Sequence, residues 1–160
     1  MPTIIRTVAG LAIGGAALWG VAGIDDTTRD DTGQIVEEGD LGVFVTQVGD
    51  CLNFEDPAAT LVSMTKGVPC STQHHWQVIF KAKVSVDEYD EVEIENEVDY
   101  LCENALEDLV EGLSDEKLDE YQNATTFQLL PSRESFAEGD RTVDCLIGSD
   151  KEYYFSSLFD

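Results

Sequence analysis

Basic residues are scarce in this sequence of 160 residues. Nine lysines and arginines stand against 33 aspartates and glutamates, which gives a formal net charge of −24 at pH 7. DNA, RNA and anionic lipid headgroups all require a basic surface on the protein that binds them. The shortage of cations therefore excludes nucleic-acid binding as a function.

Histidine is scarcer still, because the chain has only His74 and His75, in the stretch GVPCSTQHHWQVIF at residues 67–80. A zinc site needs three or four converging ligands, and adjacent histidines on a strand would point to opposite faces. A Cys70/His74 nucleophile needs a free thiol, which an exported protein with four cysteines rarely keeps. We therefore expect no metal and no catalytic residue here. A histidine bonded to backbone is the simplest interpretation, and His74 and Arg141 are the candidates for a polar site.

Motifs of the common enzyme classes are also missing. The sequence has no G-x-S-x-G, no H-E-x-x-H and no glycine-rich loop that could cradle phosphate. The many carboxylates cannot be paired into an acid and a base from sequence alone. We expect a protein that is not an enzyme and that has no cofactor.

The N-terminus contains a long apolar run. Arg6 is followed by no other charge until Asp25. Counted from Ile4, a helix would span about 31 Å, which is enough for a hydrocarbon core of about 30 Å. The sequence thus predicts one transmembrane helix in residues 1–24. Arg6 before it and acids after it favour a single-pass protein of the inner membrane, with a cytoplasmic N-terminus and an extracytoplasmic domain. A cleaved signal peptide, with small residues at 21–23, is the alternative.

This predicted membrane helix is rich in glycine and alanine. Small residues recur at four-residue spacing and would let another helix approach closely in lipid. The sequence therefore predicts packing against the helices of an integral membrane protein complex, and the alternative is a simple anchor. The residues predicted to form this packing surface are Gly10, Ala12, Gly14, Ala16 and Gly20.

Residues 25–40 are polar and acidic and have no hydrophobic period, so we interpret them as a linker to a folded domain at 41–160. Within that domain the pattern first alternates with a period of two, which predicts a half-buried strand. Its inward face would consist of Trp76, Val78, Phe80, Ala82, Val84 and Val86. Other short strands are expected within 41–54, 60–67, 125–130, 141–148 and 152–159.

A long amphipathic helix follows, and Ser114 can cap a short second helix. Apolar residues at helical spacing form its buried stripe: Val98, Leu101, Cys102, Ala105, Leu106, Leu109, Val110 and Leu113. The predicted fold class is α+β, mainly antiparallel sheet with one long helix and a short second one, two disulfides, and the transmembrane helix in front.

The acidic residues concentrate in one block. Residues 87–121 contain sixteen acids and one lysine, Lys117. This block is either a docking face for a basic protein partner or the solvated face of a helix adapted to salt, and the sequence does not decide between the two. No calcium loop of the D-x-D-x-D-G type interrupts it.

Four cysteines outside the membrane predict two disulfides. Cys102 lies on the buried stripe of the helix, and Cys145 shares an inward face with neighbouring apolar residues. We therefore favour Cys102–Cys145 together with Cys51–Cys70. Cys51–Cys145 with Cys70–Cys102 is the main alternative.

Four stretches together resemble a known family: VGDCL at 48–52, VPCSTQHHWQV at 68–78, the helix cysteine Cys102, and PSRESFAEGDRTVDCL at 131–146. They are similar to the septum-formation domain of actinobacterial envelope proteins, across about residues 43–147. Gln73, Gln77 and Phe136 depart from the residues usual in that family. The resemblance implies an anchored, extracytoplasmic domain. It also implies a turn at Gly139–Arg141 in which Arg141 pairs with a carboxylate.

These observations predict a non-enzymatic accessory or scaffold subunit of an inner-membrane complex, for which the respiratory supercomplex is a candidate. The first alternative is a factor in cell division, septum formation or the cell wall, as the family resemblance implies. The second alternative is an envelope enzyme that uses Cys70 and His74.

Overall fold

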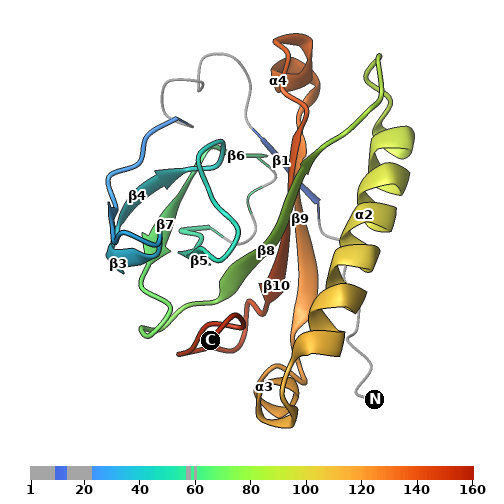
Figure 1. The fold of residues 1–160 in the computed structure, drawn as a ribbon. Coiled ribbons are helices and arrows are strands. Elements are labelled where there is room, and N and C mark those ends of the chain that lie inside the picture. Colours follow the sequence, from blue (N-terminus) through green and yellow to red (C-terminus); the bar gives the residue numbers. More distant parts are fainter. Residues whose placement is uncertain (1–9, 14–22, 57–58, 60) are drawn as a thin grey trace.

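The computed structural model describes residues 10–13, 23–56, 59 and 61–160. The fold is α+β, as expected, and consists of a large, mainly antiparallel sheet with a long helix beside it (Figure 1). The helices are α2 (Glu91–Gly112), α3 (Asp115–Glu120) and α4 (Arg133–Ala137). The strands are β1 (Gly10–Ile13), β2 (Thr28–Arg29), β3 (Ile35–Glu37), β4 (Gly39–Gly42), β5 (Cys51–Asn53), β6 (Leu61–Val62), β7 (Met64–Val68), β8 (Trp76–Lys83), β9 (Thr125–Pro131) and β10 (Thr142–Gly148).

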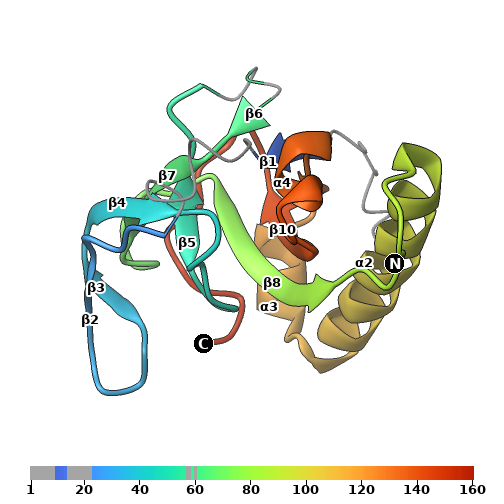
Figure 2. The same ribbon diagram turned by 90° about the horizontal axis from the view of Figure 1, so that it is seen from above.

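The large sheet curls on itself. Its eight strands follow the order β4-β7-β5-β8-β10-β9-β1-β6, and β2 with β3 forms a separate two-stranded sheet. β6 is at one end of this order and β7 is next to the other end, yet only Ser63 separates them in the chain. The two ends of the sheet must therefore lie close together, so the sheet forms a barrel-like layer with α2 outside it (Figure 2).

Two hydrophobic cores lie on the two faces of this sheet. The first fills the curled sheet and contains Ile35, Leu41, Val43, Leu52, Trp76, Val78, Phe127, Leu129 and Leu146. The second lies between the outer face of the sheet and α2, and includes Ile94, Val98, Cys102, Leu106, Leu130, Val143, Cys145 and Ile147. The long central strands β9 and β10 contribute to both cores, so nearly all of their residues are buried.

Local signals in the sequence account for the helices. Asp90 caps α2 by accepting a hydrogen bond from the backbone N–H of Glu93. The predicted apolar stripe faces the sheet, with Val98, Cys102 and Leu106 buried. Ser114 caps α3 in the same way, as the sequence predicts.

The predicted face of β8 is only partly right. The pairing of β10 with β8 shifts register between Cys145 and Leu146, so that Ile79 is an extra residue in β8. Such a bulge moves every later side chain to the opposite face. Val78 consequently lies inside the curled sheet, whereas Val84 packs on the helix side.

The expectation of a linker at 25–40 was wrong, because much of this segment is part of the fold. It forms β2, β3 and the first half of β4, and β4 pairs with β7 in the main sheet. Ile35 is buried in the inner core. The strands are only two to four residues long, which is too short for a hydrophobic period to show.

The expected last strand at 152–159 is also absent from the fold. This segment makes one isolated bridge, between Tyr154 and His74, and is otherwise irregular.

The predicted transmembrane helix falls mostly outside the described residues. Within it, residues 10–13 form β1, a strand and not a helix, that pairs in parallel with β9 and β6. Such pairing satisfies the backbone polar groups that an isolated apolar segment would leave open to water. Across residues 10–13, 23–56, 59 and 61–160, no helix has the length and apolar character needed to cross a membrane.

Candidate functional site

A groove of about 470 Å³ opens beside the Cys51–Cys70 disulfide. Three segments that are distant in the sequence form its walls, namely residues 32–36, 47–51 and 68–71, and Phe159 closes it near the end of the chain. Val36, Val48 and Phe159 are about half exposed around it. We call this feature the disulfide groove.

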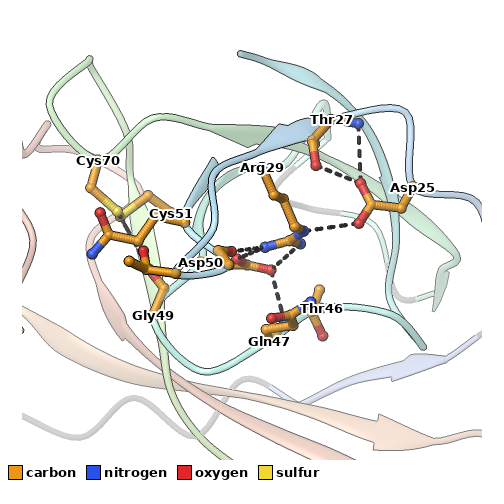
Figure 3. Close-up of polar contacts among 12 residues, drawn as sticks. Asp25, Thr27, Arg29, Thr46, Gln47, Gly49, Asp50, Cys51 and Cys70 are labelled. Atoms are coloured by element: carbon orange, nitrogen blue, oxygen red, sulfur yellow. Dashed lines mark hydrogen bonds and ion pairs between the residues drawn. A yellow bond between two sulfur atoms is a disulfide. The ribbon is translucent and has the colours of Figure 1, made fainter. Parts of the chain in front are cut away.

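An ion pair supports one wall of the groove. Both terminal nitrogens of Arg29 donate to the Asp50 carboxylate, over 2.7 and 2.9 Å. The side chains of Arg29 and Asp50 are only 14% and 3% exposed. The hydrogen bonds to Asp50 raise the pKa of Arg29 above its ordinary value. Figure 3 shows the guanidinium group between Asp50 and Asp25.

The contacts around this pair fix the β2–β3 hairpin against the body of the protein. Arg29 also donates to Asp25 over 3.0 Å and to the carbonyl oxygen of Gly33 over 2.8 Å. Burial alone would raise the pKa of Asp25, but hydrogen bonds from Thr27 and Arg29 outweigh it and lower that pKa. Asp50 accepts a further hydrogen bond from the backbone N–H of Gln47. A single arginine therefore links three segments of the chain (Figure 3).

Gln77 of β8 fixes the opposite side of the groove and is fully buried. Its side-chain nitrogen donates to the carbonyl oxygen of Gly49 over 3.0 Å and to the Ser157 hydroxyl over 2.8 Å. Its side-chain oxygen accepts from the backbone N–H of Leu158 over 2.8 Å. These bonds hold the C-terminal segment, and with it Phe159, beside the groove.

A second buried ion pair lies behind the loop that contains Thr46. Lys81 lies 2.9 Å from the carboxylate of Asp144, and Thr46 donates to the same carboxylate over 2.5 Å. Burial raises the pKa of Asp144, although the attraction of Lys81 opposes this effect. Lys81 is not part of the inward face that the alternating pattern predicts for this strand, and the bulge in β8 accounts for its position beside the buried Asp144.

His74 is fully buried and bonded to backbone, as its simplest interpretation predicts. Its Nδ1 donates to the carbonyl oxygen of Thr72 over 2.9 Å, and its main chain exchanges two hydrogen bonds with Tyr154. Burial lowers the pKa of His74 below its ordinary value. The imidazole is therefore a neutral structural group at physiological pH.

His75 contacts a different set of residues from His74. Its Nδ1 is 2.9 Å from the carbonyl oxygens of Ser149 and Glu152, and its ring packs on that of Tyr153. Gly148 is close by, where any Cβ atom would collide with the carbonyl group of His75. The two adjacent histidines thus hold the segment after β10 at two different points.

The structure forms both of the favoured disulfides, Cys51–Cys70 and Cys102–Cys145. The second one ties α2 to β10, and the first one borders the groove. No cysteine in the described part of the chain is free.

Arg141 does not make the contact that the family resemblance implies. The predicted turn exists, with Gly139 at a φ of 101°. Arg141, however, donates to the carbonyl oxygens of Phe136 and Asp140 and lies over the Phe136 ring. Asp140 instead accepts from Ser135 and from the backbone of Thr142, so the turn is closed without a pair between Arg141 and a carboxylate.

The small residues predicted to pack in a membrane are only partly described. Gly10 and Ala12 are in β1. Gly14, Ala16 and Gly20 lie outside the described residues.

Sequence reasoning missed the ion pair that supports the groove wall, Arg29 with Asp50. One signal was available, because Arg29 is the only cation among the seven acids of residues 25–40. A lone arginine in an acidic segment is expected to pair with a carboxylate, because its guanidinium group forms strong bidentate hydrogen bonds with one.

The residues around the groove offer apolar and polar contacts to a ligand. Within the described ranges, no three His, Cys, Asp or Glu side chains are grouped so that they could hold a metal ion. Asp50 in the groove wall is already paired with Arg29. The exposed residues around the groove are mixed, since Val36, Val48 and Phe159 are apolar whereas Thr32, Gln34, Gln47, Ser71 and Asp160 are polar or charged. Such a surface can take a short peptide segment with an apolar side chain.

A protein-family model described as septum formation matches residues 48–153 of this chain. The match covers more than half of the chain and includes all four cysteines, both histidines and Asp50. It confirms the resemblance seen in the sequence. Neither the curated proteins nor the solved structures contain a significant match.

Proposed function

Because the chain belongs to the septum-formation family, we propose that it acts in cell division as a non-catalytic envelope factor that binds a partner through the disulfide groove. The family match is the observation that carries this proposal. The main functional expectation from the sequence was a non-enzymatic accessory or scaffold subunit of an inner-membrane complex, with the respiratory supercomplex as a candidate. Nothing in the comparisons supports that expectation, and they favour the cell-division alternative.

One property of the fold and one of the sequence support an extracytoplasmic position. Both cysteine pairs form disulfides, and such bonds persist mainly in oxidising compartments outside the cytoplasm. The apolar run that precedes Asp25 is compatible with export and with an anchor. We propose that the N-terminal segment anchors the protein in the inner membrane and that residues 25–160 lie outside.

The alternative of an envelope enzyme loses its two candidate residues. Cys70 is bonded to Cys51 and therefore has no thiol. His74 is buried and uses its Nδ1 to bond the backbone of Thr72. A binding role requires neither a nucleophile nor a base. It requires rigid groove walls, and the contacts of Arg29 and Gln77 hold these walls in place.

The experiment that tests this function is to delete the gene and to follow a fluorescent fusion of the full chain in dividing cells. The proposal predicts enrichment of the fusion at septa and misplaced or delayed septa in the deletion strain. A His74→Asn variant should restore normal septa, because no catalysis is involved. An even distribution around the cell together with normal septa in the deletion strain would overturn the proposal.

A further inference from the structure

The inference concerns the outer edge of β9. This strand pairs with β10 on one side and with β1 on the other. β1 contributes only four residues, in parallel register from Gly10 opposite Gln128 to Ile13 opposite Pro131. β6 pairs with β1 and, within the described part of the chain, with no other strand. β1 therefore fills a slot between β9 and β6, which we call the strand slot.

The surroundings of the strand slot are apolar on both sides. Residues 127–131 of β9 are all buried. Phe127 and Leu129 belong to the inner core, whereas Leu130 belongs to the core beneath α2. A strand placed beside β9 is thus covered on both faces, and such strands have continuous apolar sequences, not alternating ones. The sequence of β1, Gly-Leu-Ala-Ile, fits this requirement.

One polar group in the slot lacks a partner. Gln128 is buried, and its side-chain nitrogen donates to Asp99 of α2 over 2.9 Å. Its side-chain oxygen has no hydrogen-bond partner among the described residues. Gln128 lies directly opposite Gly10, which has no side chain that could donate. Paired residues of parallel strands point to the same face, so a donor side chain at this position of an incoming strand would reach the Gln128 oxygen.

The occupant of the slot belongs to the same apolar run that the proposed function places in the membrane. Residues 10–13 cannot be in both places, because a membrane helix bonds its own backbone and a strand bonds its neighbour. When the segment enters the bilayer, the backbone groups of β9 that face the slot lose their partners. An apolar sheet edge in that state is a site for pairing with another chain.

We propose that the strand slot is a docking site for an extended segment of a partner protein, which adds to the sheet parallel to β9 while residues 10–13 are in the membrane. This inference depends on the membrane anchor of the proposed function. A second copy of the chain is a poor donor, because its own residues 10–13 would also be in the bilayer. The segment has about four consecutive apolar residues, a donor side chain opposite Gln128, and basic flanks that complement the net charge of −24.

The test uses the full chain in nanodiscs of zwitterionic lipid. Protease protection first reports whether the N-terminus is inserted. Hydrogen exchange then follows those backbone amides of residues 128–130 that point away from β10 and toward the slot. The probe is a peptide that repeats residues 8–15 between two pairs of lysines. The matched control is the same peptide with proline in place of its leucine and isoleucine, because proline cannot complete a strand ladder.

The slot proposal predicts fast exchange, in the inserted protein, at those amides of residues 128–130 that point toward the slot, and at least tenfold slower exchange of the same amides when the lysine-flanked peptide is added. The proline peptide should have no such effect. If the slot-facing amides of β9 are already protected in the inserted protein, or if the peptide does not change their exchange, the slot proposal is overturned and the anchor is not affected. A protein that does not insert would overturn both the anchor and the slot, while septal enrichment is measured independently in cells.

Discussion

Arg29 shows how one side chain holds the groove together. Its partner Asp50 is 3% exposed, so the loss of the arginine would leave a carboxylate with little water and no countercharge. Removing one partner of a buried ion pair lowers the free energy of unfolding by about 3 kcal/mol. Replacing both partners by well-packed apolar residues costs much less. By contrast, the pair of Lys66 and Asp40 is 45% and 47% exposed, and water screens such pairs strongly.

We therefore expect Arg29→Ala to lower the free energy of unfolding by about 3 kcal/mol, measured by chemical denaturation. The matched control, Lys66→Ala, should leave the denaturation midpoint almost unchanged. Equal effects of the two substitutions would mean that burial of the Arg29–Asp50 pair is energetically unimportant.

His74 gives the protein a dependence on pH. Burial lowers its pKa below the ordinary value of about 6.5, so the unfolded chain takes up the proton more readily than the folded one. The folded state accordingly loses stability as the pH falls below about 6.5, and regains it above.

In His74→Asn, an amide can still donate to the carbonyl oxygen of Thr72 but does not titrate. We expect the fall in unfolding free energy between pH 7.5 and 5.5 to be smaller in this variant than in the wild type. His75→Asn serves as the control and should keep the wild-type fall, since His74 is still present. An unchanged fall in His74→Asn would show that other groups cause the pH dependence.

The elements divide into those that a local pattern predicts and those that depend on distant contacts. α2 and the cap at Ser114 follow from apolar spacing and from one capping residue, so the sequence predicts them well. The hairpin of β2 and β3 depends on Arg29 meeting Asp50, 21 residues away. The bulge at Ile79 depends on the pairing of β8 with β10, and the local sequence of β8 does not predict it. Register and long-range pairing were the limits of sequence reasoning here.

The two disulfides connect elements over different lengths of chain. Cys51 and Cys70 are 19 residues apart, whereas Cys102 and Cys145 are 43 residues apart. A crosslink stabilises a fold chiefly by restricting the unfolded chain, and a longer loop restricts it more.

From these separations we expect losses of about 3 kcal/mol for a Cys51→Ala, Cys70→Ala double variant and about 4 kcal/mol for Cys102→Ala, Cys145→Ala. Chemical denaturation of both variants under the same conditions provides the comparison. A larger loss from the shorter loop would show that contacts in the groove, not chain entropy, dominate the effect of the first disulfide.

At the scale of the whole molecule, the disulfide groove and the acidic face lie on different elements. The acids of residues 87–121 are concentrated on α2 and α3, whereas the groove is built from the β2–β3 hairpin, the loop before β5 and the loop after β7. Binding of a basic protein at 87–121 stays a prediction, and so does packing of the N-terminal segment in a membrane complex. The groove needs neither of them to bind a partner.

The measurement that tests the central claim most directly is septal enrichment of fluorescent full-length variants in a deletion strain. Val48→Asp with Phe159→Asp places two charges beside the groove, and both wild-type side chains are about half exposed, so the fold should tolerate them. Val92→Asp with Tyr100→Asp adds the same charge at exposed apolar positions on α2. At equal protein levels, we expect the groove variant to lose septal enrichment and the α2 variant to keep it. A groove variant that still gathers at septa and restores division would contradict the account.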